Sequence, residues 1–436
     1  MRTLVIPLGL AAAMLVPAAS AQDALPLPPP PSPAAAASPP IPASRQAEAG
    51  MPAESTGVLT LDSALALAVA YNDTLRAARH EVAASDGGVL QAGLLPNPEV
   101  AVQMEDTREA SRTLTGQLNL PIELGGKRAA RVDAAQKARE LALAQLAGTQ
   151  ASLRAAVSAA FFELLIAQER VTLARGTLGI AAEGMQAAAR RVAAGKIAPL
   201  EETKARVEQA NAELELSEAT AGLAQARQAL SSLWGSPVPG FGEAGGDLQT
   251  VPAAPADVSL AGGLDAAPAL LASRREMERR QAEIEVERSR QYPDLTVSLG
   301  AKRDNGSGRG AYPVLGISLP LPLFDRNQGR LYTALRQADK AADEYRATRV
   351  RLDTELRQAA SRLAVARTSA ETLRATVLPG AQQAYGAARR GFEAGKFTYL
   401  DVLDAQRTLF QARIRYLGVL AGAYQAAAAI DGILGR

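Results

Sequence analysis

The stretch Arg190-Arg191-Val192-Ala193-Ala194-Gly195-Lys196 occurs a second time, about 200 residues further along the chain, as Arg390-Gly391-Phe392-Glu393-Ala394-Gly395-Lys396. The first copy continues to Leu200-Glu201 and the second to Leu400-Asp401, and the register holds without a gap as far as Gly235 and Gly435. A period of this length is far too long for a solenoid. It indicates a domain-sized half that has been duplicated once.

The pattern on both sides of this repeated stretch is helical. Gly195 and Gly395 suit the position just after the end of a helix, where the backbone turns left-handed. Upstream, helical pattern covers about 126–193 and about 327–394, and each helix would be about 100 Å long at a rise of about 1.5 Å per residue. Apolar residues from Leu352 to Val377 follow a heptad spacing, which favours coiled-coil packing. Pro379 should kink the second long helix or break its hydrogen-bond ladder locally. Return helices are expected at about 199–234 and about 398–434.

Alternating apolar and polar residues precede each long helix and predict two β-hairpins, at about 99–120 and about 294–320. A shorter helix comes before each hairpin, at about 61–95 and about 260–290. Each half therefore consists of a helix, a hairpin, a long helix, a tight turn and a return helix. The expected boundaries are 59–235 for the first repeat, 236–258 for a Gly/Pro-rich linker, and 259–436 for the second repeat.

The N-terminus has the features of an export signal. Arg2 precedes a short apolar run that ends at Ala19-Ser20-Ala21, so residues 1–21 are expected to be a secretory signal peptide. No other stretch is expected to span a membrane as a helix. Residues 22–58 are rich in Pro, Ala and Ser and are expected to form a disordered linker. The chain has no cysteine, which excludes disulfides and a lipid on an N-terminal cysteine.

Four strands are too few to close a barrel, and an open sheet has two edges that invite pairing. A sheet inside a membrane must be closed, because unpaired backbone groups in hydrocarbon are costly. The simplest closed arrangement is a homotrimer in which four strands from each subunit form one 12-stranded β-barrel. The long helices would continue that barrel as an α-helical coiled-coil tube in the periplasm. The fold class predicted is thus a mixed α+β membrane protein with an internal two-fold repeat.

Several motifs resemble those of the TolC-type outer-membrane factors, which are the exit ducts of tripartite efflux and secretion systems. The resemblance covers about 59–435. The motifs that carry it are Leu59-Thr60-Leu61, Leu94-Leu95-Pro96-Asn97-Pro98, Ala394-Gly395-Lys396 and Tyr399-Leu400-Asp401-Val402-Leu403-Asp404-Ala405-Gln406. The segment Pro121-Ile122-Glu123-Leu124-Gly125-Gly126-Lys127-Arg128 further resembles the heavy-metal (cobalt–zinc–cadmium) branch, whose partners are resistance-nodulation-division (RND) pumps.

The resemblance implies where this chain acts and with what. The trimer would sit in outer-membrane lipid and extend into the periplasm, where it would meet a periplasmic adaptor (membrane fusion) protein and an inner-membrane RND pump. The docking tip would be formed by Gly195, Lys196, Gly395 and Lys396. Heavy-metal cations are the expected cargo; drugs or other small molecules, and type I protein secretion, remain the alternatives.

The resemblance also implies a pore constriction at the tip. Asp401 and Asp404 fall on the acidic pair that rings the constriction in the family, and Glu201 occupies the matching place in the first half. Six aspartates near one axis would raise each other's pKa and attract cations. The simpler alternative is that these acids only interact favourably with the positive end of the helix dipole. Phe392 and Phe397 stand where better-known members have the tyrosine and arginine that latch the closed tip, so the latch must differ here.

Other chemistry is sparse. His80 is the only histidine, and without cysteine a conventional metal site is not expected; no cofactor is expected either. The pair Glu201-Glu202 is expected to be solvated, and Gly125-Gly126-Lys127-Arg128 superficially resembles a phosphate loop but lacks its spacing.

The net charge of +2 does not indicate a nucleic acid partner. No nucleophile–base pair points to an enzyme, and the duplication disfavours a periplasmic adaptor or soluble scaffold. Arg303, Asp304 and Arg309 are expected to be solvent-facing loop charges near a hairpin tip.

Overall fold

The structure is a computed structural model of the chain, and it describes residues 57–106, 108–248, 250–253, 262–305 and 310–436. The expected signal peptide lies outside the described residues, and so does the expected linker apart from Gly57 and Val58. All elements below belong to one unit, 49–436.

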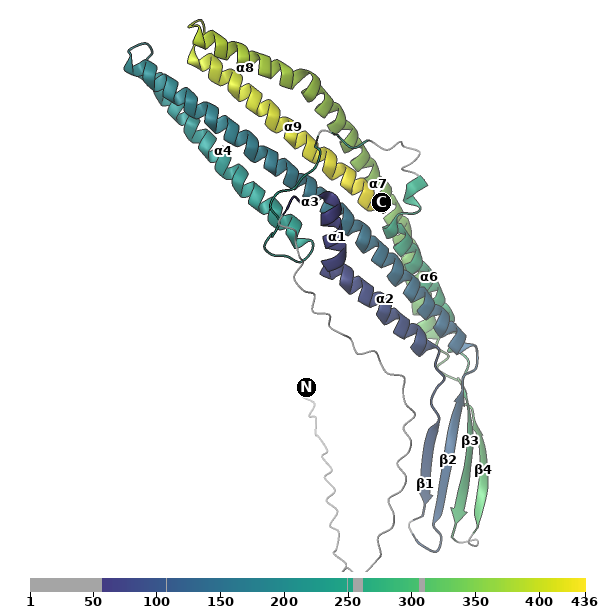
Figure 1. Cartoon of the computed structure of the whole chain (residues 1–436). Coiled ribbons are helices and arrows are strands. Elements are labelled where there is room, and N and C mark those ends of the chain that lie inside the picture. Colours follow the sequence, from purple (N-terminus) through teal and green to yellow (C-terminus); the bar gives the residue numbers. More distant parts are fainter. Residues whose placement is uncertain (1–56, 107, 249, 254–261, 306–309) are drawn as a thin grey trace, which may run out of the picture. The chain divides into compact units, whose positions relative to one another are not determined.

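Long helices and one four-stranded sheet make up this unit (Figure 1). The hairpin, a long helical stretch and a return helix follow one another in 99–232 and again in 295–434. The helices are α1 (Leu61–Tyr71), α2 (Asp73–Ala92), α3 (Lys127–Ala193), α4 (Pro199–Ser232), α6 (Pro268–Ser289), α7 (Gln328–Thr372), the π-helical turn η1 (Leu373–Val377), α8 (Leu378–Glu393) and α9 (Tyr399–Leu434). The strands are β1 (Glu99–Glu105), β2 (Thr113–Ile122), β3 (Leu295–Asp304) and β4 (Ala311–Ser318).

Two of the shorter helices differ from the prediction. The helix expected over 61–95 is broken at Asn72, whose backbone is extended. The Asn72 side chain accepts a hydrogen bond from the Leu75 N–H and donates one to the Leu233 carbonyl, both at 2.8 Å. It therefore caps α2 and ties that cap to the end of α4. The helix expected over about 260–290 is also interrupted: residues 262–264 are helical, residues 265–267 are not, and α6 then begins with Pro268 in its first turn, where a missing N–H costs nothing.

The predicted disturbance at Pro379 is confirmed. The five residues Leu373–Val377 form a π-helical turn directly before α8, and Pro379 lies in the first turn of α8. A proline cannot donate to the carbonyl one turn earlier, and its ring pushes that carbonyl away. The ladder takes up one extra residue at this point, and the helix then continues.

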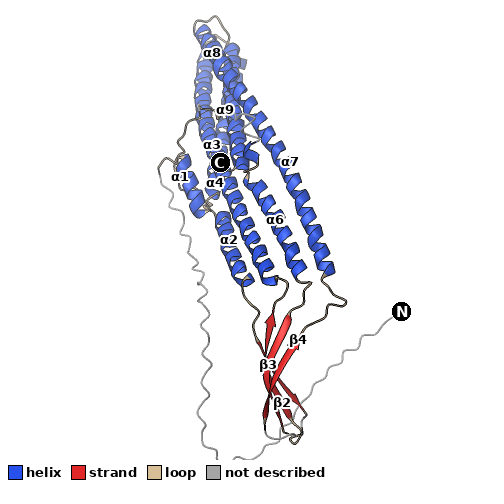
Figure 2. Ribbon diagram, turned by 90° about the vertical axis from the view of Figure 1, so that its right-hand side faces the viewer, coloured by secondary structure: helices blue, strands red, loops and turns tan. Residues whose placement is uncertain are grey.

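Helices α2, α3, α6 and α7 lie side by side next to the sheet, in the same order as the strands that they adjoin (Figure 2). Beyond them α3 continues beside α4 and α9, and α9 runs beside α8. By length and composition α3 and α9 could each cross a membrane, with 18-residue windows of mean hydropathy 1.3 and 1.4. The expectation that no other stretch is apolar and long enough to span was therefore wrong; both helices are rich in alanine and pack against other helices of the chain.

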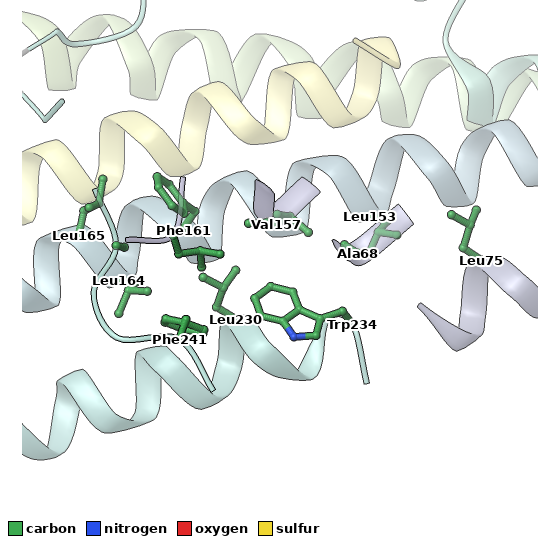
Figure 3. Packing of buried hydrophobic residues seen from close by; sticks show 13 residues of the cluster. Ala68, Leu75, Leu153, Val157, Phe161, Leu164, Leu165, Leu230, Trp234 and Phe241 are labelled. Carbon is green, nitrogen blue, oxygen red and sulfur yellow. The ribbon is translucent and has the colours of Figure 1, made fainter. Parts of the chain in front are cut away.

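The largest apolar core lies where α1, α3 and the end of α4 meet (Figure 3). Trp234 and Phe161 are fully buried there, and Leu230 packs between them. Burial of large side chains such as these contributes about 1.5–3 kcal/mol each, so this cluster anchors the short helix α1 to the long helix α3. Away from it the helix contacts are mostly alanine and leucine, as in the buried row Leu352, Leu356, Ala359 and Leu363 of α7.

The four strands form one antiparallel sheet in the order β1-β2-β3-β4. The register places Val100, Leu118, Leu299 and Leu315 in one row across all four strands, and Gln103, Thr115, Lys302 and Tyr312 in a row on the opposite face. The apolar face is the exposed one: Val100 is 74 % and Leu315 73 % exposed, whereas polar residues such as Thr115 are half-buried. This is the reverse of a sheet in a water-soluble core.

Two ion pairs fasten the sheet to the helices. Lys127 at the start of α3 contacts Asp294 just before β3, with 2.7 Å between Nζ and Oδ1. Arg131, one turn further along α3, pairs with Glu123 just after β2. The segment that superficially resembled a phosphate loop therefore has a structural role, because its lysine joins the first half of the chain to the second.

Candidate functional site at the helical tips

Two tight turns mark the ends of the long helices farthest from the sheet (Figure 1). Gly195 and Gly395 adopt left-handed backbone angles, with φ of 67° and 73°. The N–H of Lys196 donates to the Arg191 carbonyl at 2.9 Å, and the N–H of Lys396 donates to the Gly391 carbonyl at 2.8 Å. These bonds close a Schellman motif in both turns, so the predicted role of the two glycines as helix terminators is confirmed.

All four residues predicted for the docking tip are exposed. A Cβ atom added to Gly195 or to Gly395 would meet nothing within 4 Å, so the turns present bare backbone to their surroundings. Lys196 and Lys396 follow directly and are exposed as well. Each tip is therefore a small convex surface made of backbone and one cation.

Asp401 is part of a capping box at the start of α9. The backbone N–H of Thr398 donates to its Oδ2 at 2.8 Å, and the Thr398 hydroxyl donates to the same oxygen at 2.7 Å. In return the Asp401 N–H donates to Thr398 Oγ1 at 3.3 Å. The side-chain and backbone hydrogen bonds from Thr398 lower the pKa of Asp401. The sequence analysis predicted that the pKa values of these aspartates would be raised where three subunits converge. Within one chain the hydrogen bonds of the helix cap dominate, and they lower the pKa of Asp401.

The other two acids of the predicted constriction lie near the same end. Asp404 is exposed one turn after Asp401. Glu201 lies in the first turn of α4 and pairs with Lys204, with 2.9 Å between Oε1 and Nζ. The structure places the two aspartates on one exposed side of α9, whereas the salt bridge of Glu201 lies within α4.

Aromatic and cationic side chains join the two hairpins just behind the turns, a contact that the sequence did not reveal. The guanidinium of Arg191, on α3, lies 4.0 Å from the centroid of the Phe392 ring, on α8. Phe392 in turn packs against Tyr399 of α9, with 5.7 Å between ring centroids. Tyr399 is buried together with Ala188 of α3 and Ala205 of α4, and burial raises its pKa to about 12.

An ion pair extends this contact along the helices. Arg407 of α9 pairs with Glu208 of α4, and the Glu208 side chain is only 13 % exposed. The pair raises the pKa of the Arg407 guanidinium through its hydrogen bond with Glu208. The heptad pattern could have indicated which faces pack, but the partners depend on how far one hairpin is shifted along the other.

The two phenylalanines of the expected latch behave differently. Phe392 takes part in the contact between the hairpins, whereas Phe397 lies against Gly391 of its own hairpin and is half exposed. Arg191 and Tyr399 also take part in this contact. The remaining candidates have local roles: His80 is exposed on α2, and Glu202 pairs with Arg206 at 2.7 Å. The described residues contain no group of three potential metal ligands.

The sequence matches known proteins along nearly its whole length. The family model described as "Outer membrane efflux protein" matches residues 64–236 and 263–436. The cobalt-zinc-cadmium resistance protein CzcC of Cupriavidus metallidurans is 57 % identical over 442 residues, which covers 100 % of both chains. The nickel and cobalt resistance protein CnrC of the same organism is 30 % identical over 68 % of this chain and 70 % of its own.

Solved structures agree on the fold. The CusC channel superposes with a TM-score of 0.74 at 18 % identity and covers 86 % of this chain and 91 % of its own. The outer-membrane channel OprN gives a TM-score of 0.73 at 20 % identity over 86 % and 89 %. Because the family model covers both halves and the first relative is similar from end to end, the chain belongs to the outer membrane efflux protein family, whose members are outer-membrane channels.

Proposed function

We propose that this chain is the outer-membrane exit duct of a tripartite RND-type efflux system and that its cargo is heavy-metal cations. The observation that carries the proposal is the 57 % identity with a cobalt-zinc-cadmium resistance protein over the whole of both chains. The second relative is also a resistance protein for divalent metals. Drugs and secreted proteins are less favoured as cargo, because no relative reported above is named for them.

The sheet supports the assembly. Its exposed face is apolar, and its polar face is half-buried along the central strands β2 and β3, as expected for strands that face lipid on one side and water on the other. Among the described residues, β1 and β4 each pair with one strand, which leaves two sheet edges. In a homotrimer these edges would pair between subunits and close a 12-stranded barrel, which satisfies every backbone group in the membrane. The helices would then form the periplasmic tube.

The tips would be the end that meets a periplasmic adaptor protein and, through it, an inner-membrane pump. Gly195-Lys196 and Gly395-Lys396 offer bare backbone and a cation at a convex end, which suits contact between one helical tip and another. In the trimer Asp401, Asp404 and Glu201 would surround the axis just inside these tips. A ring of carboxylates at a narrow point attracts cations and excludes anions.

The constriction can be tested by removing its charge. We expect Asp401→Asn with Asp404→Asn to abolish cation selectivity and to weaken block by multivalent cations, because asparagine keeps the size and the oxygen acceptor but loses the charge. Single-channel recordings in planar bilayers measure both. Asp353→Asn, on the exposed side of α7, is the matched control and should conduct like the wild type. Unchanged selectivity in the double variant would show that the two acids only stabilise the start of α9 and do not line the constriction.

Asp401 should also keep its charge in mild acid. The hydrogen bonds from Thr398 depress the pKa of Asp401, so its charged form is favoured in the folded protein. The stabilisation from this cap is present above the ordinary aspartate pKa and is lost as the pH falls through the depressed value. Selectivity should therefore persist to a lower pH in the wild type than in Thr398→Val.

The contact between the hairpins should hold the tip closed. Phe392→Ala would remove the stacking of Arg191, which crosses between the hairpins and is worth about 0.5–2 kcal/mol, and would leave Tyr399, which packs on α3 and α4, without its aromatic neighbour. We expect the balance between closed and open tips to shift roughly tenfold towards open, since about 1.4 kcal/mol is a factor of ten. Phe397→Ala is the control, because that ring contacts its own hairpin. Equal opening in both variants, measured as channel conductance, would contradict the assignment.

The cargo is tested in cells. A strain that lacks this chain should lose tolerance to zinc, cobalt and cadmium and regain it when the wild-type chain is supplied, while its tolerance to a panel of drugs stays unchanged. Tolerance is measured as the lowest concentration that stops growth. Loss of drug tolerance with unchanged metal tolerance would replace the metal proposal by drug export.

A further inference from the structure

One charged residue interrupts the apolar face of the sheet. Strand β3 extends to Asp304, so Arg303 is a strand residue and not the loop residue that the sequence predicted. It lies opposite Leu114 on β2 and Ala311 on β4, on the face that carries the row Val100, Leu118, Leu299 and Leu315. Among the strand residues that the structure describes on this face, Arg303 alone is charged, and it is exposed.

The position of Arg303 along the strands is the end farthest from the helices. The apolar face begins at the pair Ile122 and Leu295, near the helices, and its last paired row contains Leu114 and Arg303. Eight residues along an antiparallel strand span about 27 Å at about 3.4 Å each. Tilted by about 35–45°, as membrane strands are, they cover about 20 Å of the apolar band of an outer-membrane barrel, which is about 25 Å tall. Arg303 therefore falls at the edge of the hydrocarbon, where a charge costs little, and not at its centre.

A second arginine continues the same side of the sheet. Arg112 stands two residues before Leu114, and its carbonyl accepts a hydrogen bond from the Asn305 N–H at 3.1 Å, which extends the pairing by one step. Alternation along the strand places Arg112 on the face of Leu114 and Arg303. The strand acids at this end, Glu105 and Asp304, lie on the other face, where Glu105 pairs with Lys302 at 3.6 Å. Among the described strand residues, the charge on the outward face at this end is therefore positive.

We infer that Arg303, together with Arg112, binds the phosphate groups of the lipids that surround the loop end of the barrel. This inference rests on the proposed function, because it needs the apolar face to lie in a bilayer. A guanidinium suits the task, since it stays charged, forms paired hydrogen bonds with phosphate oxygens, and has a long apolar stem that can lie along Leu114. The occupant is an anionic lipid headgroup at the level of the last strand row.

Lipid A, a bisphosphorylated glycolipid, and its dephosphorylated form are the probes. Full-length protein in detergent micelles is mixed with each, and native mass spectrometry measures the lipid retained. The wild type should retain the phosphorylated form in preference, and Arg303→Gln should weaken that retention about tenfold, as expected for loss of a charge-assisted hydrogen bond. Arg303→Lys should keep part of the preference. Lys302→Gln is the control, because it removes the same charge from the neighbouring residue on the polar face.

Three outcomes would overturn the inference: equal retention of both lipids by the wild type, equal retention by Arg303→Gln and the wild type, or the same loss in Lys302→Gln. Channel recordings on the same preparations separate this from failure of the proposed function. If the wild type forms channels but shows no phosphate preference, only the lipid site is wrong. If the wild type forms no channel at all, the barrel proposal fails and the lipid site fails with it.

Discussion

Gly300→Ala should abolish assembly of the protein in the outer membrane. Gly300 lies on β3 opposite Gln117 of β2 and Val314 of β4. A Cβ at this position would overlap the carbonyl oxygen of Gly116 and the Cα and Cβ of Gln117. These are mostly backbone atoms of a paired strand, which cannot turn aside as a flexible side chain can. Overpacking a tight site costs about 1–3 kcal/mol, and here each subunit of the proposed trimer would carry the penalty.

Gly316→Ala is the matched control for this experiment. Gly316 lies on the neighbouring strand β4, and a Cβ there would meet the side chain of Ser298 at 3.4 Å, an ordinary contact. We expect the Gly316 variant to form heat-resistant trimers in the membrane fraction and the Gly300 variant to accumulate as unassembled protein. Normal trimer from Gly300→Ala would mean that β2 and β3 are not packed in the barrel as they are in the single chain.

The repeated elements of this fold could be predicted because local rules govern them. A glycine with left-handed backbone angles ends a helix, so Gly195 and Gly395 allowed both turns to be predicted at the correct residue. Pro379 disturbs any helix that contains it, and the π-helical turn lies directly before its helix. Strict alternation placed the strands to within a few residues, since a one-residue shift would move every apolar side chain to the other face.

Features that depend on distant partners could not be predicted. The break at Asn72 is fixed by the carbonyl of Leu233, which lies 161 residues away. Asparagine also occurs within helices, so the sequence alone could not distinguish a cap from a helical position. The pair of Glu208 and Arg407 and the stacking of Arg191 on Phe392 likewise depend on how two hairpins are aligned. The end of β3 was misplaced because Asp304-Asn305-Gly306 is typical of a turn.

The way in which the two hairpins are aligned determines which residues of the predicted docking tip are exposed. The two tips lie at the same end, but their packed contacts lie behind the turns and leave the glycines and lysines exposed. A partner that touches the turns can therefore reach them without first breaking the contact of Phe392 with Arg191. If docking also opens the channel, it must act through the helices, because the turn residues take no part in that contact.

Gly395→Trp should reduce metal tolerance to the level of a strain that lacks the chain. The added indole would project from the turn into the space that a partner's helical tip must occupy, since nothing in the chain lies within 4 Å of this position. Tip-to-tip contact depends on close approach of the backbones, so a bulky side chain should block docking completely. Trimer yield and channel conductance in bilayers should stay close to those of the wild type, because the turn is exposed and lies at the far end from the sheet.

Bulk must be separated from backbone strain, because Gly395 has φ of 73° and most residues are disfavoured there. Gly395→Asn makes that separation, since asparagine tolerates the left-handed conformation better than other side chains and is small. We expect the asparagine variant to keep most of the metal tolerance and the tryptophan variant to lose it. If both variants lose tolerance equally, the loss comes from the altered turn conformation and not from blocked docking. If both keep it, the adaptor binds elsewhere, and the second tip at Gly195 is the next place to introduce the same pair of substitutions.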